Sequence, residues 1–387
     1  MVKAIKVMLI PNNVQKTKMF QYAGASRFAY NWALAREIEN YEKGGKFISD
    51  AELRKEFTKL RHSDEYAWLL NISNNVTKQA IKDACTAYKN FFKGLQKFPR
   101  FKSKKRSMPK FYQDNVKIRF SNTHVKFEGF SSSRKANKQK MNWVRLAEHG
   151  RIPTDVKYRN PRISFDGLNW WISVCVEFPD CRETLNDDGV GIDLGIKDLA
   201  VCSDGTKYKN INKSQKVKKL EKQKRRLQRS ISRSYEKNKK GESYCKTNNV
   251  IKKEKLLLKR NHRLTNIRKN YLNQTISEII NRKPRFICIE DLNVSGMMKN
   301  RHLSKAVQEQ GFFWFRKQLE YKCSDKGIQL IVADRFYPSS KLCSCCGNIK
   351  KDLKLSDRVY RCACGNMIDR DFQASINLKT YGEKFAG

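Results

Sequence analysis

The fold is decided by Val190-Gly191-Ile192-Asp193-Leu194-Gly195, an apolar stretch that one acid interrupts, which predicts a buried strand. A second strand, predicted at 285–290, runs through Phe286-Ile287-Cys288-Ile289 and ends in Glu290. A third acidic segment, Asp369-Arg370-Asp371-Phe372, begins a predicted helix. A carboxylate at the end of a buried strand is costly unless it meets a cation. The three segments therefore predict a common cation site.

The elements around these acids alternate between strands and helices. They are a hairpin at 199–205, a basic helical stretch at 213–281 broken at 240–249, a helix at about 303–325, a strand at 328–333 and a last helix from about 371. A β-hairpin followed by alternating α and β elements fits a ribonuclease-H-like α/β domain. If the two acid-bearing strands are neighbours and the last helix packs across their ends, Asp193, Glu290 and Asp371 converge.

Three converging carboxylates have the ligand chemistry of two-metal phosphodiester hydrolysis, in which oxygen ligands hold two Mg²⁺ ions about 3.5–4 Å apart. Mg²⁺ keeps several waters and takes few carboxylates, so three acids suffice. Any one of these acids alone would be better explained as a residue that keeps the end of a strand soluble. Asp369 is the reserve candidate for the third position.

The charge of the chain predicts a polyanionic partner. Lys and Arg total 81 against 38 Asp and Glu, a net charge of +43 over 387 residues. Release of counterions from phosphates is what such a surplus can use, whereas an enzyme of small neutral metabolites has no need of it. A hydrophobic content of 39% argues against a disordered basic tail. No apolar run approaches the roughly 18 residues of a membrane span, and we expect a cytoplasmic protein, nucleoid-associated when on DNA.

The N-terminal half is predicted to combine a small β-barrel with a helical bundle. Strands are predicted at 1–10, 116–120, 124–127, 162–165 and 171–176, and helices at about 14–42, 49–60 and 75–95. The charged stretch 180–188 is predicted to be a linker. Phe98, Phe101, Trp143, Trp170 and Trp171 could stack nucleic-acid bases, although a core position is the commoner role for such residues.

The twelve cysteines divide into seven scattered residues and a cluster of five. The cluster forms two knuckles, Cys343-Ser344-Cys345-Cys346 and Cys362-Ala363-Cys364, whose spacing is close to that of a zinc ribbon. Four thiolates around a tetrahedral Zn²⁺ would fold a segment that is too small for its own core. The predicted ligands are Cys343, Cys346, Cys362 and Cys364, and Cys345 is a spare thiol or an alternative ligand.

Two helices within 213–281 carry dense positive charge. The first contains Lys216, Lys218, Lys219, Lys222, Lys224, Arg225, Arg226 and Arg229, and the second Lys252, Lys253, Lys255, Lys259, Arg260, Arg263 and Arg268. Such runs are often only solvated helix faces. With few acids nearby the two helices should repel each other, which favours a bound polyanion.

The acidic and cysteine motifs together resemble a known family. Gly191-Ile192-Asp193-Leu194-Gly195, Ile289-Glu290-Asp291-Leu292-Asn293 and Asp369-Arg370-Asp371 resemble the three segments of a RuvC nuclease domain. With the intervening cysteines and Pro338-Ser339-Ser340-Lys341, the chain resembles TnpB, the transposon-encoded RNA-guided nucleases related to type V CRISPR effectors. The resemblance implies that Asp193, Glu290 and Asp371 are catalytic. The chain departs from the family pattern at Gln373, where an Asn is usual.

The resemblance implies a multidomain α+β protein. The expected parts are a β-barrel (wedge-like) domain at 1–12 and 108–182, an inserted helical recognition bundle at 13–107, a RuvC domain at 188–338 and 366–387, and a zinc ribbon at 339–365. It also implies an RNA-guided, Mg²⁺-dependent DNA endonuclease with structural Zn²⁺. A guide RNA would choose the target DNA, the N-terminal half would recognise a short adjacent motif, and one site would cut both strands. We expect a monomer in the ribonucleoprotein and no membrane partner.

Three alternatives stay open at this point. A small type V CRISPR effector would use the same chemistry with a CRISPR RNA, although the length of this chain favours TnpB. A junction resolvase or transposase would act without a guide. A non-catalytic DNA-binding repressor is disfavoured by the complete set of acids.

Overall fold

The computed structural model describes residues 1–131, 141–179, 183–354 and 357–386. The chain forms two compact units, Met1–Pro179 and Asp180–Gly387, and the boundary lies at the start of the predicted linker. The finer division into four domains stays a prediction. Among the described residues, no helix has the length and apolar character needed to cross a membrane.

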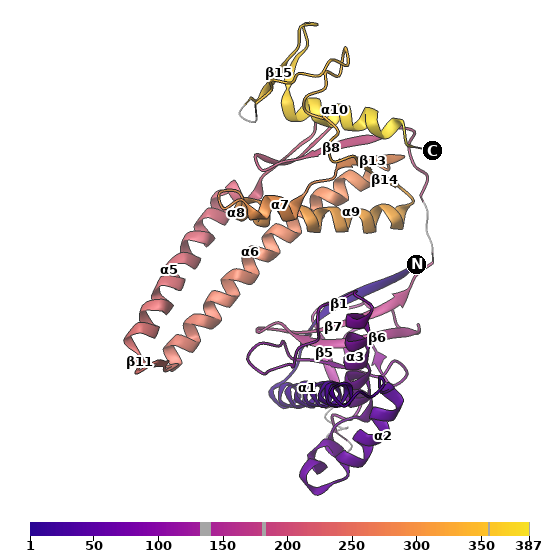
Figure 1. The fold of residues 1–387 in the computed structure, drawn as a ribbon, viewed down its shortest axis with the longest axis vertical. Coiled ribbons are helices and arrows are strands. Elements are labelled where there is room, and N and C mark those ends of the chain that lie inside the picture. Colours follow the sequence, from indigo (N-terminus) through magenta and orange to yellow (C-terminus); the bar gives the residue numbers. More distant parts are fainter. Residues whose placement is uncertain (132–140, 180–182, 355–356, 387) are drawn as a thin grey trace. The chain divides into compact units, whose positions relative to one another are not determined.

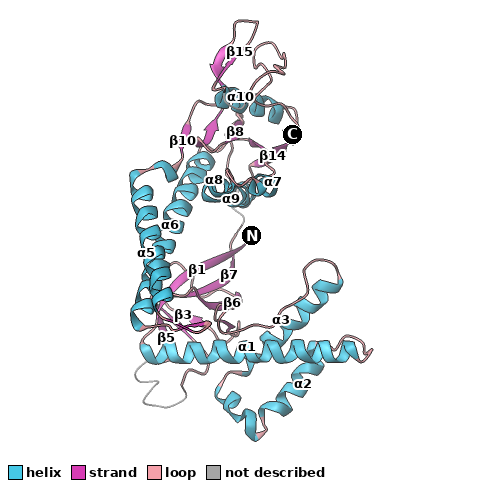
Figure 2. Ribbon diagram, turned by 60° about the vertical axis from the view of Figure 1, so that its left-hand side comes forward, coloured by secondary structure: helices cyan, strands magenta, loops and turns pink. Residues whose placement is uncertain are grey.

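The first unit contains a seven-stranded sheet, in the order β2-β6-β7-β1-β5-β4-β3 (Figures 1 and 2). Its strands are β1 (Val2–Ile10), β2 (Lys110–Tyr112), β3 (Arg119–Phe120), β4 (His124–Lys126), β5 (Trp143–Leu146), β6 (Tyr158–Phe165) and β7 (Trp170–Glu177). All described pairings are antiparallel, and β6 and β7 form a hairpin. No pairing among the described residues joins β2 to β3, so closure into a barrel stays a prediction.

The helices of the first unit are α1 (Asn13–Glu42), α2 (Asp50–Arg61), α3 (Asn74–Phe92) and the 3₁₀ helix η1 (Asp64–Asn71). A capping box formed by Ser49 and Glu52 begins α2. The strand predicted at 116–120 was too long. The side chain of Asp114 accepts hydrogen bonds from the backbone N–H groups of Val116 and Lys117, and this turn leaves only Arg119–Phe120 extended.

The second unit is built on a five-stranded sheet in the order β10-β9-β8-β13-β14. Its strands are β8 (Val190–Leu194), β9 (Asp198–Cys202), β10 (Lys207–Lys209), β13 (Phe286–Glu290) and β14 (Gln329–Ala333). β8, β13 and β14 are parallel, whereas β8 to β10 pair in antiparallel fashion, and the hairpin predicted at 199–205 is the one between β9 and β10. The two acid-bearing strands are therefore neighbours, as predicted.

Helices cover both faces of this sheet (Figure 1). They are α5 (Gln215–Lys237), α6 (Asn248–Asn281), α7 (Val294–Lys299), α8 (Ser304–Gln310), α9 (Phe312–Lys326) and α10 (Arg370–Glu383). Alternate residues of a strand point to opposite faces. Ile287 and Ile289 pack with residues of α6 and α9, while Phe286 and Cys288 pack with Leu378 of α10. Glu290 follows the second set, so it belongs to the face that α10 covers.

The helix predicted at about 303–325 is two helices. Gly311 separates α8 from α9 with a φ of 72°, a left-handed conformation that favours glycine. Beyond β14, the cysteine-rich segment contains only the short pair β15 (Val359–Arg361) and β16 (Met367–Asp369). Another short pair, β11 (Lys239–Lys240) and β12 (Ser243–Tyr244), joins α5 to α6.

Candidate active site

Asp193 and Glu290 occupy neighbouring positions at the ends of two parallel strands. Ile192 pairs with Ile289, so the next residue of each strand is one of the two acids. Gly191 brings α10 onto this face, because a Cβ at that position would lie 2.1 Å from the Ser375 carbonyl oxygen. Only glycine therefore allows the helix backbone to approach so closely, and the start of α10 carries the third acid.

Burial raises the pKa values of two of these acids, and carboxylate charge adds to the rise at Asp193. Burial raises the pKa of Asp193 well above its usual range, and the charges of Glu290 and Asp371 raise it further. Burial also raises the pKa of Glu290, while the Ser339 hydroxyl and the charge of Arg370 oppose that rise. A buried carboxylate beside two other acids, as Asp193 is, forms a site that a cation would stabilise.

Asp369 and Asp371 have different surroundings. Asp369 caps α10, where its Oδ1 accepts hydrogen bonds from the N–H groups of Asp371 and Phe372, both at 3.1 Å. Although burial opposes the change, the Phe372 N–H and Lys207, 3.3 Å away, lower the pKa of Asp369. Asp369 thus has a capping role of its own, and Asp371 is the acid whose charge acts most strongly on Asp193 after Glu290.

Glu290 is held from the side of the cysteine-rich segment. The hydroxyl of Ser339, a residue that is almost fully buried, donates a hydrogen bond to Oε1 of Glu290. Asn377 of α10 in turn donates to the carbonyl oxygens of Ser339 and Leu342, at 2.6 and 2.7 Å. Helix α10 therefore holds the loop that contains Ser339, and this loop in turn holds the side chain of Glu290.

Asp291 is an acid of different character from its neighbour. It forms ion pairs with Arg316 at 2.7 Å and Arg335 at 2.5 Å, and the hydrogen bonds from these arginines lower its pKa. Glu290 lines two cavities beside this cluster, of about 320 and 490 Å³, and Arg335 lines both. Arg316 and Arg335 had no signal in the sequence, because α9 and the loop after β14 meet Asp291 only in the folded chain.

The four predicted zinc ligands come together. The Sγ atoms of Cys343, Cys346, Cys362 and Cys364 all lie within 4.8 Å of one another. Two of the distances, Cys343 to Cys364 and Cys346 to Cys362, are 3.6 and 3.5 Å, close to the roughly 3.8 Å expected for two thiolates on one tetrahedral Zn²⁺. Cys345 is exposed and outside the cluster, so the geometry does not select it as a ligand.

Hydrogen bonds to the cluster favour a thiolate. Although burial opposes the change, backbone N–H groups of Cys346 and Cys345 and the side chain of Asn366 lower the pKa of Cys343 to about 6. Among the described residues, no set of three acids forms so tight a metal-ligating cluster. Carboxylates that share two ions need not converge on one point, since such ions lie about 3.5–4 Å apart.

Gln373, where the family usually has Asn, is fully buried and well bonded. Its amide donates to the Leu342 carbonyl at 2.6 Å and accepts from the Ser344 hydroxyl at 2.9 Å. The residue therefore ties α10 to the first cysteine knuckle, and the departure leaves no gap in the local hydrogen bonding.

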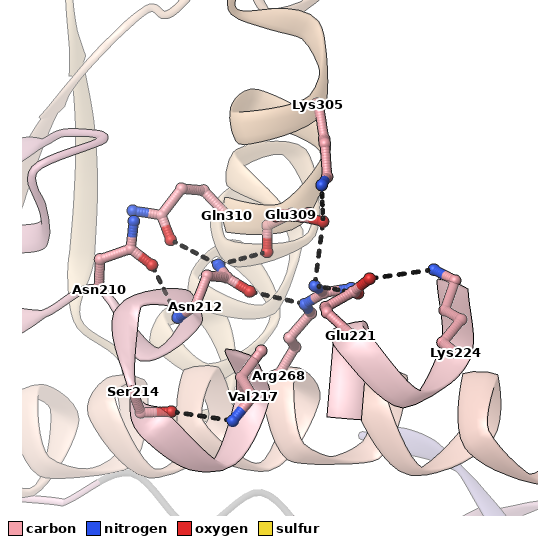
Figure 3. A network of polar contacts seen from close by, with 10 residues as sticks. All are labelled: Asn210, Asn212, Ser214, Val217, Glu221, Lys224, Arg268, Lys305, Glu309 and Gln310. Carbon is pink, nitrogen blue, oxygen red and sulfur yellow. Dashed lines mark hydrogen bonds and ion pairs between the residues drawn. The ribbon is translucent and has the colours of Figure 1, made fainter. Parts of the chain in front are cut away.

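The basic helices α5 and α6 are anchored at one end by a polar network (Figure 3). Arg268 of α6 contacts Glu221 of α5 and Glu309 of α8, both at 3.2 Å, and donates to Asn212 at 2.7 Å. Gln310, next to Glu309, donates to the carbonyl oxygen of Gly195 at 2.8 Å. This chain of contacts connects the basic hairpin to the residues that follow Asp193.

The five candidate stacking aromatics separate by exposure. Trp170 is 2% exposed and belongs to the core of the first unit, and Trp171 donates to the Asp166 carboxylate at 2.7 Å. Trp143 is partly buried on β5. Phe98 and Phe101 are exposed and stay candidates for base stacking. The core role thus holds for Trp170.

Comparison with known proteins is consistent with these sites. The chain is 31% identical over 379 residues to InsQ of Escherichia coli (strain K12), which is described as a candidate RNA-guided DNA endonuclease, and the match covers 93% of this chain and 87% of InsQ. The chain belongs to the TnpB family. A second relative of this TnpB-family chain, a candidate RNA-guided DNA endonuclease of Streptomyces pristinaespiralis, is 28% identical, with 98% of this chain and 89% of the relative covered.

Three family models match parts of this TnpB-family chain. They are described as a helix-turn-helix domain for residues 1–46, a probable transposase for 173–301 and a Cas12f1-like TNB domain for 312–378. In the structure, residues 1–46 contain β1 and the single long helix α1 rather than two helices. A solved Cas12f1–sgRNA–target DNA complex has the same fold, with a TM-score of 0.58, 11% identity and 98% coverage of both chains.

Proposed function

We propose that this chain is an RNA-guided DNA endonuclease in which Asp193, Glu290 and Asp371 hold divalent metal ions in a RuvC-type site. The metal-site proposal is carried by the placement of Asp193 beside Glu290 on paired strands, where burial and the charges of Glu290 and Asp371 raise the pKa of Asp193. A structural Zn²⁺ at the four clustered cysteines completes the metal content.

The residues present fit Mg²⁺. Carboxylate oxygens are its preferred ligands, and the acids lie on the ends of β8 and β13 and the start of α10. When bound, two such ions would activate a water and stabilise the leaving oxygen of the phosphodiester. The chain itself contributes the Ser339 hydroxyl and the charge of Arg370, which act on Glu290.

Guide RNA and target DNA are the proposed partners. The relatives described as RNA-guided DNA endonucleases match nearly the whole chain, and the net charge of +43 suits phosphate backbones. The exposed side chains of α5 and α6 supply much of this charge in the second unit. We propose a single active site per chain and a monomer in the ribonucleoprotein.

Purified protein with its copurifying RNA provides the test. We expect Mg²⁺-dependent cleavage of DNA that matches the variable end of that RNA, and Glu290→Gln should abolish cleavage without weakening RNA binding. Cleavage at the normal rate by Glu290→Gln would show that the site is wrongly assigned. Full activity on branched DNA after removal of RNA would instead support a guide-independent nuclease.

A further inference from the structure

The two most exposed aromatic side chains of the described residues both line cavities that contain Glu290. Phe336 is 87% exposed and lines the larger cavity, and Phe313 is 64% exposed and lines the smaller one. Elsewhere in the second unit large aromatic rings are mainly covered, as with Phe312 and Phe315 beside Phe313. A phenyl ring gains no hydrogen bond from water, so covering an exposed ring with an apolar or aromatic ligand is favourable.

Phe336 is held on a rigid loop. Its backbone N–H donates to Oδ1 of Asp334 at 2.8 Å, and the N–H of Tyr337 donates to the Asp334 carbonyl at 3.0 Å. The ring of Tyr337 packs on that of Tyr381 with centroids 4.6 Å apart. Because these contacts hold the backbone of Phe336 and the ring of Tyr337, the exposed Phe336 ring lies on an ordered turn.

Phe313 is exposed by the geometry of its helix. It is the second residue of α9, two positions after the left-handed Gly311. Phe312 and Phe315 take the buried positions of this turn, so Phe313 adds nothing to the core. The Leu and Cys residues further along the helix, Leu319 and Cys323, continue the buried stripe.

Cationic side chains accompany both rings, and the acids Glu290, Asp291 and Asp334 line the same pair of cavities. Arg335 precedes Phe336 in the chain and lines both cavities, Arg316 lines the cavity of Phe313, and Lys341 lines that of Phe336. Arg335 engages Asp291 through Nη2, and a guanidinium has five N–H donors. Aromatic rings beside cationic side chains are what proteins use to hold unpaired nucleotides, the rings stacking on bases and the cations contacting phosphates.

From this arrangement we infer that Phe336 and Phe313 stack on unpaired bases of the DNA strand being cut, one in each cavity beside Glu290. The inference rests on the proposed function and adds the nucleotide contacts at the cut position. Stacking on a phenyl ring is tolerant of sequence, because every base has a π face. The pair would therefore hold a strand for cleavage without choosing its sequence, a choice that guide pairing makes.

The direct test uses Glu290→Gln protein with its guide RNA and target DNAs that carry 2-aminopurine at successive positions of the unpaired strand. Stacking quenches the fluorescence of this base. We expect Phe336→Ala and Phe313→Ala each to raise the fluorescence at its own position, whereas Phe336→Tyr keeps it quenched. Phe385→Ala, which removes a 57% exposed ring elsewhere in the same unit, is the matched control.

Cleavage provides the second readout, with the acids intact. Phe336→Ala should lower single-turnover cleavage at subsaturating DNA by about 5- to 150-fold, the range for loss of one base–aromatic stack, while guide RNA binding is unchanged. If no 2-aminopurine position responds to either alanine variant and the double variant cuts like Phe385→Ala, the inference is overturned. A fluorescence response in the Glu290→Gln background, combined with no cleavage of guided targets by the protein that keeps Glu290, would overturn the proposed function and leave the stacking assignment standing.

Discussion

The hydroxyl of Ser339 donates a hydrogen bond to Oε1 of Glu290, although 48 residues separate the two along the chain. Ser339 lies four residues before the first cysteine of the proposed zinc site, and Asn377 of α10 holds its carbonyl. The glutamate is therefore oriented by a loop that both the cysteine cluster and the last helix anchor.

Ser339→Ala should raise the Mg²⁺ concentration that cleavage requires, without unfolding the protein. A hydrogen bond to a charged group is worth about 1.5–3 kcal/mol, so we expect roughly a tenfold or larger rise in the Mg²⁺ concentration for half-maximal cleavage. Mn²⁺ binding, followed by electron paramagnetic resonance without DNA, should weaken in parallel. Ser340→Ala is the neighbouring control, and a Mg²⁺ requirement equal to that of the wild type in Ser339→Ala would refute the positioning role.

Asp193→Asn should abolish cleavage and raise thermal stability in the absence of divalent ions. The substitution removes a charge that burial and the neighbouring acids Glu290 and Asp371 disfavour. Added Mg²⁺ should stabilise the wild type, because an ion that binds only the folded state shifts the unfolding equilibrium, and should have little effect on the variant. Calorimetric scans with and without Mg²⁺ measure both effects. A variant less stable than the ion-free wild type would contradict the repulsion that we describe.

Gly191→Ala should separate α10 from the sheet. The added Cβ would meet backbone atoms of Ser375 and Lys379 at 2.1 and 2.3 Å, and overpacking of this kind costs about 1–3 kcal/mol. We expect a lower melting temperature and slower cleavage, since Asp371 would move with the helix. Gly24→Ala, within α1 and with nothing inside 4 Å of the new Cβ, should instead be neutral or stabilising by about 0.5–1 kcal/mol.

Cys346→Ser should remove zinc from the protein, whereas Cys345→Ser should not. Only the first belongs to the cluster of four thiols within 4.8 Å. Plasma mass spectrometry should find about one Zn²⁺ per chain in the wild type and in Cys345→Ser, and proteolysis should cut the 339–365 segment of Cys346→Ser faster. Zinc retained by Cys346→Ser but lost from Cys345→Ser would exchange the two roles.

Arg268→Ala should destabilise the base of the basic hairpin. It removes two ion pairs and the hydrogen bond to Asn212, and it leaves Glu221 and Glu309 without this partner. We expect a loss of roughly 2–3 kcal/mol, below the cost of breaking a fully buried pair because the site is partly solvated. Arg263→Ala removes the same charge from an exposed position of the same helix. Equal melting temperatures for the two variants would refute the anchoring role.

The sequence was a good guide wherever one periodicity governed a segment. The strands bearing Asp193 and Glu290 were predicted because their apolar runs are buried on both sides. The break at Gly311 was missed because Phe312 and Phe315 continue a helical pattern across it. The two turn hydrogen bonds at Asp114 shortened the strand expected at 116–120. Alternation of apolar and polar side chains does not reveal that a turn competes with the strand for these residues.

Within the site, the chemical types of the acids and cysteines were sufficient to nominate them, whereas their supporting contacts were not predictable. Ser339, Asn377 and Arg335 act through tertiary contacts whose partners lie far away in the chain. A single sequence carries no signal for such pairs, since neither spacing nor burial pattern marks them. The departure at Gln373 likewise became interpretable only when its two hydrogen bonds to the first knuckle were seen.

The position of Asp371 on α10 has a consequence for biosynthesis. Ribosomes deliver the chain from its N-terminus, so the basic hairpin and the strands of Asp193 and Glu290 emerge before the final carboxylate does. On the proposed assignment of the site, a nascent chain would be unable to cut DNA until residue 371 has emerged. A premature stop codon just upstream of residue 371 would then yield a product that keeps most of its polycationic surface without the proposed nuclease activity.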